Sequence, residues 1–345
     1  MSKALSPFAK RLVDWQLVHG RHDLPWQNTR DPYRVWLSEI MLQQTQVVTV
    51  MGYYQRFLTA FPDVQTLAAA HLDQVLGLWS GLGYYSRARN LHACAQQVVS
   101  EFAGVFPQRV EQLQTLKGIG LSTAAAIASL CFEQRVAILD GNVKRVLTRH
   151  QGFALDLSSS ANEKKLQAVA DACLPLKEVD MPSYTQGIMD LGATLCTRSA
   201  PACTRCPVSA DCVAFAGGNP GDYPVKTRKI KRSSQSLWLL CATTHDGEVC
   251  LQQRPAKGVW AGLFTQPLFD SAEQLLAAVP KRLHVQLRWE PAFVHVLTHK
   301  DLHLHACYLD VKAPLKLGEG SWYKAGQWQV MGLPAPVRQL LSQTL

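Results

Sequence analysis

Residues 116–126 have the sequence LKGIGLSTAAA, in which two glycines precede a helix predicted over 121–132. Glycine lets the backbone come close to another group because it has no Cβ atom. The first N–H groups of the following helix have no partner within that helix and can donate to a phosphate. A tight turn between two helices would give the same pattern, so this segment indicates a phosphate-binding hairpin only together with the motifs around it.

Four cysteines lie close together with the spacing C-x6-C-x2-C-x5-C, and they are Cys196, Cys203, Cys206 and Cys212. The chain has ten cysteines and no recognisable export signal, so clustered cysteines indicate a metal site rather than a disulfide framework. Four thiolates at this spacing can bind a [4Fe-4S] cluster. Zinc is the alternative, but zinc sites more often combine two short C-x2-C pairs, and this loop has one. The other six cysteines are expected to be buried apolar side chains.

The order of the motifs resembles the adenine DNA glycosylase (MutY) family of the endonuclease III superfamily. The motifs are SEIMLQQTQ at 38–46, GLGYY at 81–85, the hairpin at 116–120, LDGNVKR at 139–145 and the cysteine loop at 196–212. The resemblance covers essentially all of residues 1–225. It implies a mainly α-helical helix-hairpin-helix DNA glycosylase fold with a [4Fe-4S] cluster loop, and it favours iron–sulfur over zinc.

The chain has 345 residues, of which 47% are hydrophobic, and this is enough for two domains. We expect a helical catalytic domain over 1–225, a basic linker over 226–235 and a smaller α+β domain over 236–345. Helices of the first domain are predicted over 64–79, 86–102, 109–116, 121–132, 141–150, 161–173 and 183–195.

The C-terminal domain is predicted to contain two hairpins. Leu237–Thr244 and Glu248–Arg254 are strand-like runs on either side of Asp246-Gly247, a hairpin turn signal. Ala292–Leu297 and Leu302–Val311 flank a second turn, predicted at His299–Asp301. This domain is more loosely similar to the Nudix-like (MutT-like) recognition domain of the same family. It lacks the G-x5-E-x7-REUxEE pattern whose carboxylates hold Mg²⁺, so we expect 8-oxoguanine recognition without pyrophosphate hydrolysis.

The resemblance implies excision of adenine mispaired with 8-oxoguanine or guanine, and two acidic residues suit this chemistry. Cleavage of an N-glycosidic bond requires protonation of the base and stabilisation of positive charge on the sugar. Glu39 has the apolar neighbours Trp36 and Ile40, so desolvation would raise its pKa and favour a general acid. Asp140 precedes a helix whose N–H donors would favour the ionised form that stabilises the sugar. A solvated helix face for Glu39 and a plain N-cap for Asp140 are the alternatives.

Ser122 occupies the position where the lyases of the superfamily have a nucleophilic lysine, two residues after the hairpin. Serine cannot form the Schiff base that β-elimination requires, so we expect a monofunctional glycosylase that leaves an abasic site. Lys144 is the remaining candidate for an incidental imine, although its neighbour Arg145 favours a phosphate contact.

The resemblance also implies several DNA contacts. The target nucleotide must leave the base stack, which costs on the order of a few kcal/mol. Gln44 and Tyr84, with Gln43 nearby, are the expected wedges, and ordinary helix surface is the alternative. Trp26 is expected to line the adenine pocket, and Asn142 to polarise the sugar or position water. Contacts with the DNA backbone are expected from Lys117, Gly118, Gly120, Ser122 and Lys144.

Lesion recognition is expected at the second C-terminal turn. The family places a Phe-Ser-His loop against 8-oxoguanine, and this chain has Leu297-Thr298-His299 there. Thr298 keeps a hydroxyl and His299 keeps the imidazole, while leucine replaces the aromatic ring. Gln186 stands where some members of the family have an acid, so no third catalytic carboxylate is expected.

Lysine and arginine exceed aspartate and glutamate by nine, which favours a polyanionic partner. Residues 226–232 contain five of the basic side chains and no acidic one, so this segment is either a solvated tether or a strap that contacts phosphates.

Three other functions fit parts of the sequence: an endonuclease III-like pyrimidine glycosylase with lyase activity, a noncatalytic iron–sulfur DNA-binding protein, and a nucleotide pyrophosphohydrolase. Ser122 and the C-terminal domain count against the first, and the missing acidic pattern counts against the third. We expect a monomer acting on double-stranded DNA with A:8-oxoguanine or A:G mispairs. We expect it in the bacterial cytoplasm, at the nucleoid and without a membrane segment.

Overall fold

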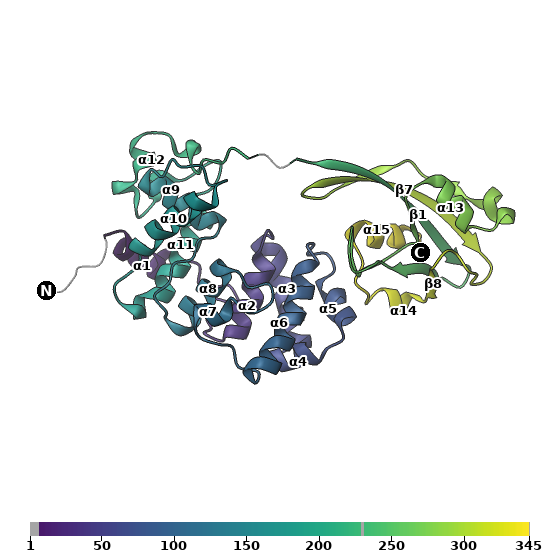
Figure 1. Cartoon of the computed structure of the whole chain (residues 1–345), viewed down its shortest axis with the longest axis horizontal. Helices are drawn as coiled ribbons and strands as arrows, with labels where there is room; N and C mark the ends of the chain where they lie inside the picture. The colour runs from purple at the N-terminus through teal and green to yellow at the C-terminus, as the bar shows by residue number, and fades with distance from the viewer. Residues whose placement is uncertain (1–6, 229–230, 345) are drawn as a thin grey trace. The chain divides into compact units, whose positions relative to one another are not determined.

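The computed structural model describes residues 7–228 and 231–344, and Figure 1 shows the chain. It divides into two compact units. Unit 1 comprises Met1–Ala68 and Ala93–Lys229, and unit 2 comprises Ala69–His92 and Ile230–Leu345. Residues 69–92, which were expected to belong to the helical domain, are therefore part of the same compact unit as the C-terminal residues. The boundaries at 225 and 235 stay a prediction, and Lys229 and Ile230 of the predicted linker lie outside the described residues.

Unit 1 consists of helices joined by short turns (Figure 1). The longer ones are α1 (Pro7–His19), α2 (Pro32–Leu42), α3 (Val47–Ala60), α6 (Ser86–Phe102, which begins in unit 2), α8 (Leu121–Phe132), α9 (Gly141–Gln151), α10 (Ser160–Ala172) and α11 (Met181–Thr194). The shorter α-helices among the described residues of unit 1 are α4 (Val64–Ala69), α7 (Val110–Leu113) and α12 (Val213–Ala216). The helices predicted near 86–102, 121–132, 141–150, 161–173 and 183–195 are confirmed.

The single helix predicted over 64–79 is wrong. The structure has α4 and a separate α5 (Leu72–Trp79), with a break at His71. The His71 backbone is extended, and its Nδ1 accepts a hydrogen bond from the N–H of Asp73 at 3.3 Å. A side-chain acceptor at this position starts a new helix instead of continuing the old one. The prediction for 109–116 was too long, because α7 ends at Leu113.

The core of unit 1 is built around α8 and α11. Helix α11 packs against α1, α8 and α9, and their buried side chains form one cluster that includes Leu12, Ala125, Val146 and Ile188. Small alanine side chains let neighbouring helices approach α8 closely, and residues 124–129 of this helix are all buried. The start of α8, next to the glycine hairpin, is thereby fixed in place.

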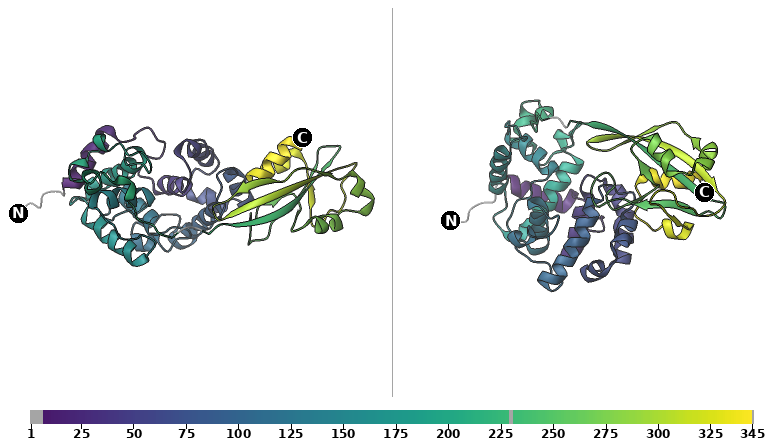
Figure 2. Two further views of the ribbon diagram at one scale, coloured as in Figure 1. Left: turned by 90° about the horizontal axis from the view of Figure 1, so that it is seen from above. Right: turned by 45° about the vertical axis from the view of Figure 1, so that its right-hand side comes forward.

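Unit 2 contains an eight-stranded sheet with the main order β3-β2-β1-β7-β5. Its strands are β1 (Ser233–Thr244), β2 (Val249–Gln253), β3 (Phe264–Thr265), β4 (Leu268–Phe269), β5 (Arg288–Trp289), β6 (Phe293–Val296), β7 (Lys300–Val311) and β8 (Ser321–Tyr323). The long strands β1 and β7 are parallel, from the pair Ser233 and Lys300 to the pair Thr244 and Val311, and they run side by side in Figure 2. Both predicted hairpins are confirmed, since β2 is antiparallel to β1 and β6 is antiparallel to β7.

The sheet of unit 2 is covered on both faces. Leu237, Leu239 and Cys241 of β1 belong to one apolar cluster, while the alternate residues Leu240 and Ala242 belong to another. This alternation is the two-residue period of a strand buried on both sides. Helices α14 (Ala325–Trp328) and α15 (Ala335–Thr344) contribute to the first cluster, and α13 (Ala272–Ala278) to the second (Figure 1).

Residues 69–92 are attached to the rest of unit 2 by direct contacts. The Tyr85 hydroxyl and the Ser80 hydroxyl both donate to the Leu333 carbonyl, at 2.7 and 2.9 Å. Arg89 Nη1 donates to the Ala261 carbonyl at 2.8 Å. A Cβ added at Gly77 of α5 would lie 2.0 Å from the Val330 carbonyl oxygen, so only glycine permits this approach.

Among the described residues, no helix has the length and apolar character needed to cross a membrane.

Candidate active site

The glycine hairpin has the backbone that its sequence predicts. Gly118 has a φ of 79°, and Gly120 is the N-cap of α8. No atom lies within 4 Å of a Cβ built at Gly120, so the approach to the first turn of α8 is open. Lys117 is exposed, and its backbone N–H donates to Gln97 Oε1 at 3.0 Å. Ser122 is half-buried in the first turn of α8. The hairpin can therefore receive a phosphate at a helix N-terminus.

Glu39 and Asp140 interact electrostatically although they are far apart in sequence. Glu39 is on the buried side of α2, between Ser38 and Ile40. Burial, and then the negative charge of Asp140, raise the pKa of Glu39 to about 7. The prediction that its apolar surroundings raise its pKa is confirmed. A carboxyl group with this pKa still carries a proton near neutral pH and can donate it.

Asp140 is the N-cap of α9, and its Oδ1 accepts a hydrogen bond from the N–H of Val143 at 2.7 Å. That donor and the positive charges of Arg145 and Lys144 lower its pKa, as the sequence predicts. Burial is the larger effect, however, and the net result is a pKa above the ordinary value. The donors that were predicted to favour the ionised form are confirmed, whereas the burial that outweighs them was not predicted, because a sequence does not show how deeply a cap residue is buried.

The other polar residues at the start of α9 have partners. Arg145 Nη2 donates to Asn142 Oδ1 at 2.8 Å and to the Gly192 carbonyl at 2.7 Å. Lys144 Nζ forms an ion pair with Glu163 Oε1 at 2.6 Å, and its side chain is 20% exposed. The amide oxygen of Asn142 and the ammonium of Lys144 are thus held by neighbours on the protein.

Trp26 lines a cavity of about 350 Å³ in unit 1. The walls come from α1, α2, α8, α11 and the loop over 20–31. Trp26 is buried, and its ring meets the edge of Tyr54 at a centroid distance of 5.3 Å. Val35 is also in the wall, one helical turn before Glu39 on α2, although Glu39 and Asp140 do not themselves line the cavity. The volume is within the usual range of small-molecule sites, which begins at roughly 300 Å³.

A buried ion pair beside this cavity was missed at the sequence level. Asp190 on α11 is fully buried, and its carboxylate accepts from the backbone N–H of Arg21 at 3.0 Å and from Nε at 2.8 Å. Arg21 Nη2 lies 2.7 Å from Asp190 Oδ1. Gln186 Nε2 donates to the same oxygen at 2.9 Å. Arg21 and Gln186 both line the cavity. An apolar helix containing an aspartate was the only sequence signal for this pair.

The two predicted wedge residues have unusual backbone conformations. Gln44, which follows α2, has a φ of 56°, and Tyr84 has a φ of 49°. Left-handed backbone at a residue other than glycine costs on the order of 1–3 kcal/mol and is commonest at functional sites. Gln43 is the C-cap of α2. Tyr84 is 44% exposed, and its loop is held by Arg87, which donates to the carbonyls at 82 and 83.

The predicted lesion-contacting turn lies between β6 and β7. The N–H of Leu297 donates to the Lys300 carbonyl at 2.8 Å, which closes the turn. The Thr298 hydroxyl is 2.7 Å from the Tyr84 hydroxyl, within unit 2. His299 is exposed at the tip. The structure therefore brings together the predicted wedge Tyr84 and the predicted lesion contact Thr298.

The four clustered cysteines, Cys196, Cys203, Cys206 and Cys212, line one small cavity of about 30 Å³. The other six are buried, as predicted. Burial is the leading cause that raises the pKa of Cys206, to about 11. Within the described part of the chain, no group of three or more histidine, cysteine or acidic side chains is placed to hold a metal ion. Four cysteine thiolates are a donor set that iron–sulfur clusters use, and the cluster at this loop stays a prediction.

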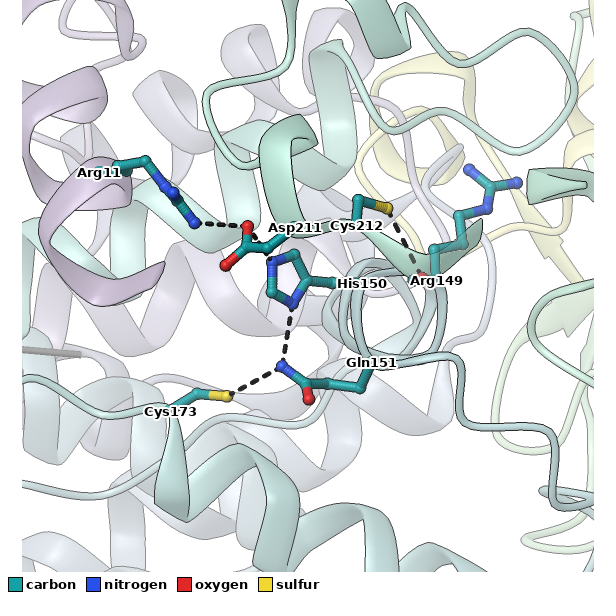
Figure 3. A network of polar contacts seen from close by, with 7 residues as sticks. All are labelled: Arg11, Arg149, His150, Gln151, Cys173, Asp211 and Cys212. Atoms are coloured by element: carbon teal, nitrogen blue, oxygen red, sulfur yellow. Dashed lines mark hydrogen bonds and ion pairs between the residues drawn. The ribbon is translucent and has the colours of Figure 1, made fainter. Parts of the chain in front are cut away.

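The cysteine loop is tied to α9 and α1 by polar contacts (Figure 3). Asp211 pairs with Arg11 of α1 and lies 3.1 Å from Nε2 of the buried His150. Arg149, also buried, donates to the carbonyls of residues 197, 198 and 220, and its Nη1 is 3.4 Å from Cys196 Sγ. These contacts position the loop, and no sequence pattern had indicated them.

Comparisons with known proteins match both parts of the chain. Residues 37–171 match the family model described as HhH-GPD superfamily base excision DNA repair protein, and residues 238–343 match the NUDIX domain model. An adenine DNA glycosylase of Buchnera aphidicola from Acyrthosiphon pisum is 34% identical over 340 residues, which covers 97% of this chain and 96% of that protein. An adenine DNA glycosylase of Mus musculus is 43% identical over 221 residues, or 61% of this chain and 42% of that protein.

Solved structures match the helical part. A thermostable thymine-DNA glycosylase superposes with a TM-score of 0.54 at 25% identity, covering 61% of this chain and 95% of the other. An endonuclease III in a non-covalent DNA complex gives a TM-score of 0.50 at 18% identity, covering 61% of this chain and 94% of the other. The second likeness shows the fold alone.

Proposed function

The chain belongs to the adenine DNA glycosylase family, and on that premise we propose that it removes adenine mispaired with 8-oxoguanine or guanine. As a DNA N-glycosylase it is a hydrolase of base excision repair. The observation that best supports its use of this chemistry is the electrostatic coupling of Glu39, with a pKa of about 7, to Asp140.

Glu39 is proposed to donate its proton to N7 of the extruded adenine. Protonation makes the base a better leaving group, and the C1′–N9 bond breaks with its electron pair going to the base. Positioned proton transfer of this kind typically contributes about 10²–10⁴-fold. The charge that develops on the sugar favours the ionised form of Asp140, which then stabilises it. Addition of water at C1′ completes the hydrolysis and leaves an abasic site.

Two features support a monofunctional reaction. Ser122 has no amine to attack the sugar. The Lys144 ammonium is in an ion pair with Glu163, and a protonated, paired amine is a poor nucleophile. We therefore propose that this protein does not cleave the strand after base removal.

Lesion recognition is proposed for unit 2. The hydroxyl contact between Tyr84 and Thr298 supports this, because one residue is the expected wedge and the other the expected 8-oxoguanine contact. Exposed His299 adds a donor or acceptor beside them. The partner is double-stranded DNA containing A:8-oxoguanine or A:G, bound by a monomer in the bacterial cytoplasm at the nucleoid.

The four cysteines that line one cavity are proposed to hold a [4Fe-4S] cluster. When bound, the cluster cross-links the loop over 196–212. The protein's own contribution is the set of contacts from Arg149, His150 and Arg11, which position the loop against α9 and α1.

A strand-nicking assay tests the function on duplexes with A:8-oxoguanine, A:G and thymine glycol. We expect nicks only after base treatment and only in the adenine-containing strands. Nicking of thymine glycol DNA without base treatment would identify an endonuclease III-like lyase instead. Binding without any base release would identify a noncatalytic DNA-binding protein.

A further inference from the structure

We propose that Arg232, the last basic residue of the segment 226–232, is a positioning residue for the turn between β6 and β7 and thereby sets the preference for 8-oxoguanine over guanine. This inference rests on the proposed role of Thr298 and His299 in lesion recognition. It gives Arg232 a role within unit 2, whereas the sequence alone leaves the whole segment as either a tether or a phosphate-contacting strap.

The turn between β6 and β7 is not of the kind that hairpins favour. The hydrogen bond from Leu297 to Lys300 closes it, so residues 298 and 299 are its two central residues. Two-residue hairpin loops favour a positive φ at the first or at both central residues, because this backbone matches the twist of the strands. Neither Thr298 nor His299 is among the described residues with a positive φ. We therefore expect contacts from outside the hairpin to stabilise this turn.

Those contacts come from Arg232 and from Ser233, the first residue of β1. The Arg232 guanidinium donates from Nη1 to the Thr298 carbonyl at 3.1 Å, and its Nη2 forms an ion pair with Asp301. The backbone N–H of Ser233 donates to the His299 carbonyl at 3.0 Å. The carbonyls of both central residues of the turn thus accept hydrogen bonds from two consecutive residues at the beginning of β1.

The shape of the guanidinium explains why arginine suits this position. Its donors lie in one rigid plane, so one side chain can bond to a carbonyl and a carboxylate at the same time. Asp301 is on β7, directly after the turn, and its carboxylate fixes the guanidinium relative to that strand. The bond from Arg232 then holds the Thr298 backbone. The Thr298 hydroxyl, which is 2.7 Å from the Tyr84 hydroxyl, is kept in place through this backbone.

A positioning role and a phosphate contact predict opposite effects for the loss of Asp301. The side chains of Arg232 and Asp301 are 41% and 31% exposed, so solvent weakens their ion pair and we expect modest effects. If Arg232 acted by contact with phosphates, loss of Asp301 would free the guanidinium and strengthen binding to any duplex. If Arg232 positions the turn, loss of Asp301 weakens lesion recognition, as loss of Arg232 does.

The test measures dissociation constants for duplexes that contain 2′-fluoro-2′-deoxyadenosine opposite 8-oxoguanine or opposite guanine. The fluorine withdraws electrons from the sugar and so slows base release during the measurement. Arg232→Gln and Asp301→Asn are each expected to lower the preference for the 8-oxoguanine duplex about fivefold. The double variant should lose no more than either single variant, because both changes remove the same interaction. Lys231→Gln removes one positive charge from an exposed neighbour, and as the matched control it should weaken binding to both duplexes equally.

Equal weakening on both duplexes by Arg232→Gln would overturn the proposal, because a phosphate contact does not distinguish the two bases. Stronger binding of Asp301→Asn to both duplexes would overturn it as well. Release of unmodified adenine opposite 8-oxoguanine by the parent protein is measured separately. Its absence would contradict the proposed glycosylase activity, whereas the ratio of dissociation constants tests Arg232 without any base release.

Discussion

Replacement of Glu39 by glutamine should lower activity and raise stability, with the second effect depending on pH. Burial raises the pKa of Glu39 from its ordinary value of 4.5 to about 7. Because the folded state holds the proton more tightly, the protein is relatively stabilised below pH 4.5 and loses that stability as the pH rises toward 7. At about 1.4 kcal/mol per pKa unit, the full loss is about 3 kcal/mol.

Glutamine cannot ionise, so Glu39→Gln avoids this loss. The variant should exceed the parent in free energy of unfolding by about 3 kcal/mol at pH 8, and by less than about 1 kcal/mol at pH 5. Adenine release should fall by about 10²–10⁴-fold because the general acid is gone. Urea titrations at both pH values, together with single-turnover release, measure the two effects.

Glu178→Gln, at an exposed glutamate, is the matched control and should change neither stability nor activity. A stability difference for Glu39→Gln that is the same at pH 5 and pH 8 would refute the reasoning, because the carboxyl would then not be titrating between those values. Retention of full activity would remove Glu39 from the mechanism.

Three other predictions follow from the structure. Thr298→Val removes the hydroxyl contact with Tyr84. Because one hydrogen bond contributes about 1 kcal/mol, the preference for 8-oxoguanine over guanine should fall several-fold while A:G cleavage is unchanged. Equal losses of cleavage on both duplexes would contradict this prediction. Replacing the five basic residues of 226–232 by glutamine should flatten the slope of log affinity against log salt by up to about 4.5, and an unchanged slope would show that the segment is only a tether. The proposed [4Fe-4S] cluster should give the purified protein visible absorbance, which Cys203→Ser should abolish and Cys94→Ser, at a buried cysteine outside the loop, should retain; a parent protein without this absorbance would contradict the cluster.

Local sequence patterns were sufficient to predict those structural features that depend only on residues a few positions away in the chain. The N-cap at Asp140, the left-handed hairpin glycine Gly118 and the turn at Gly247 all follow from residue types within a few positions. The apolar neighbours of Glu39 also indicated its raised pKa. The break at His71 was missed because a histidine cap is a weak signal within an otherwise helical pattern.

Features that depend on distant contacts could not be predicted in this way. Arg21 and Asp190 are 169 positions apart, and no periodicity relates them. The burial that raises the pKa of Asp140 comes from packing around α9. The cavity beside Trp26 is lined by side chains from four helices and a loop, so it forms only when the chain has folded.

The attachment of residues 69–92 to the C-terminal sheet has a mechanical consequence. Tyr84 is carried by a segment that is anchored through Ser80 and Tyr85 to the carbonyl of Leu333. A displacement of the sheet would therefore be passed on to Tyr84 through these hydrogen bonds. In the proposed function, contact with the opposite base and insertion of the wedge would then be coupled within unit 2.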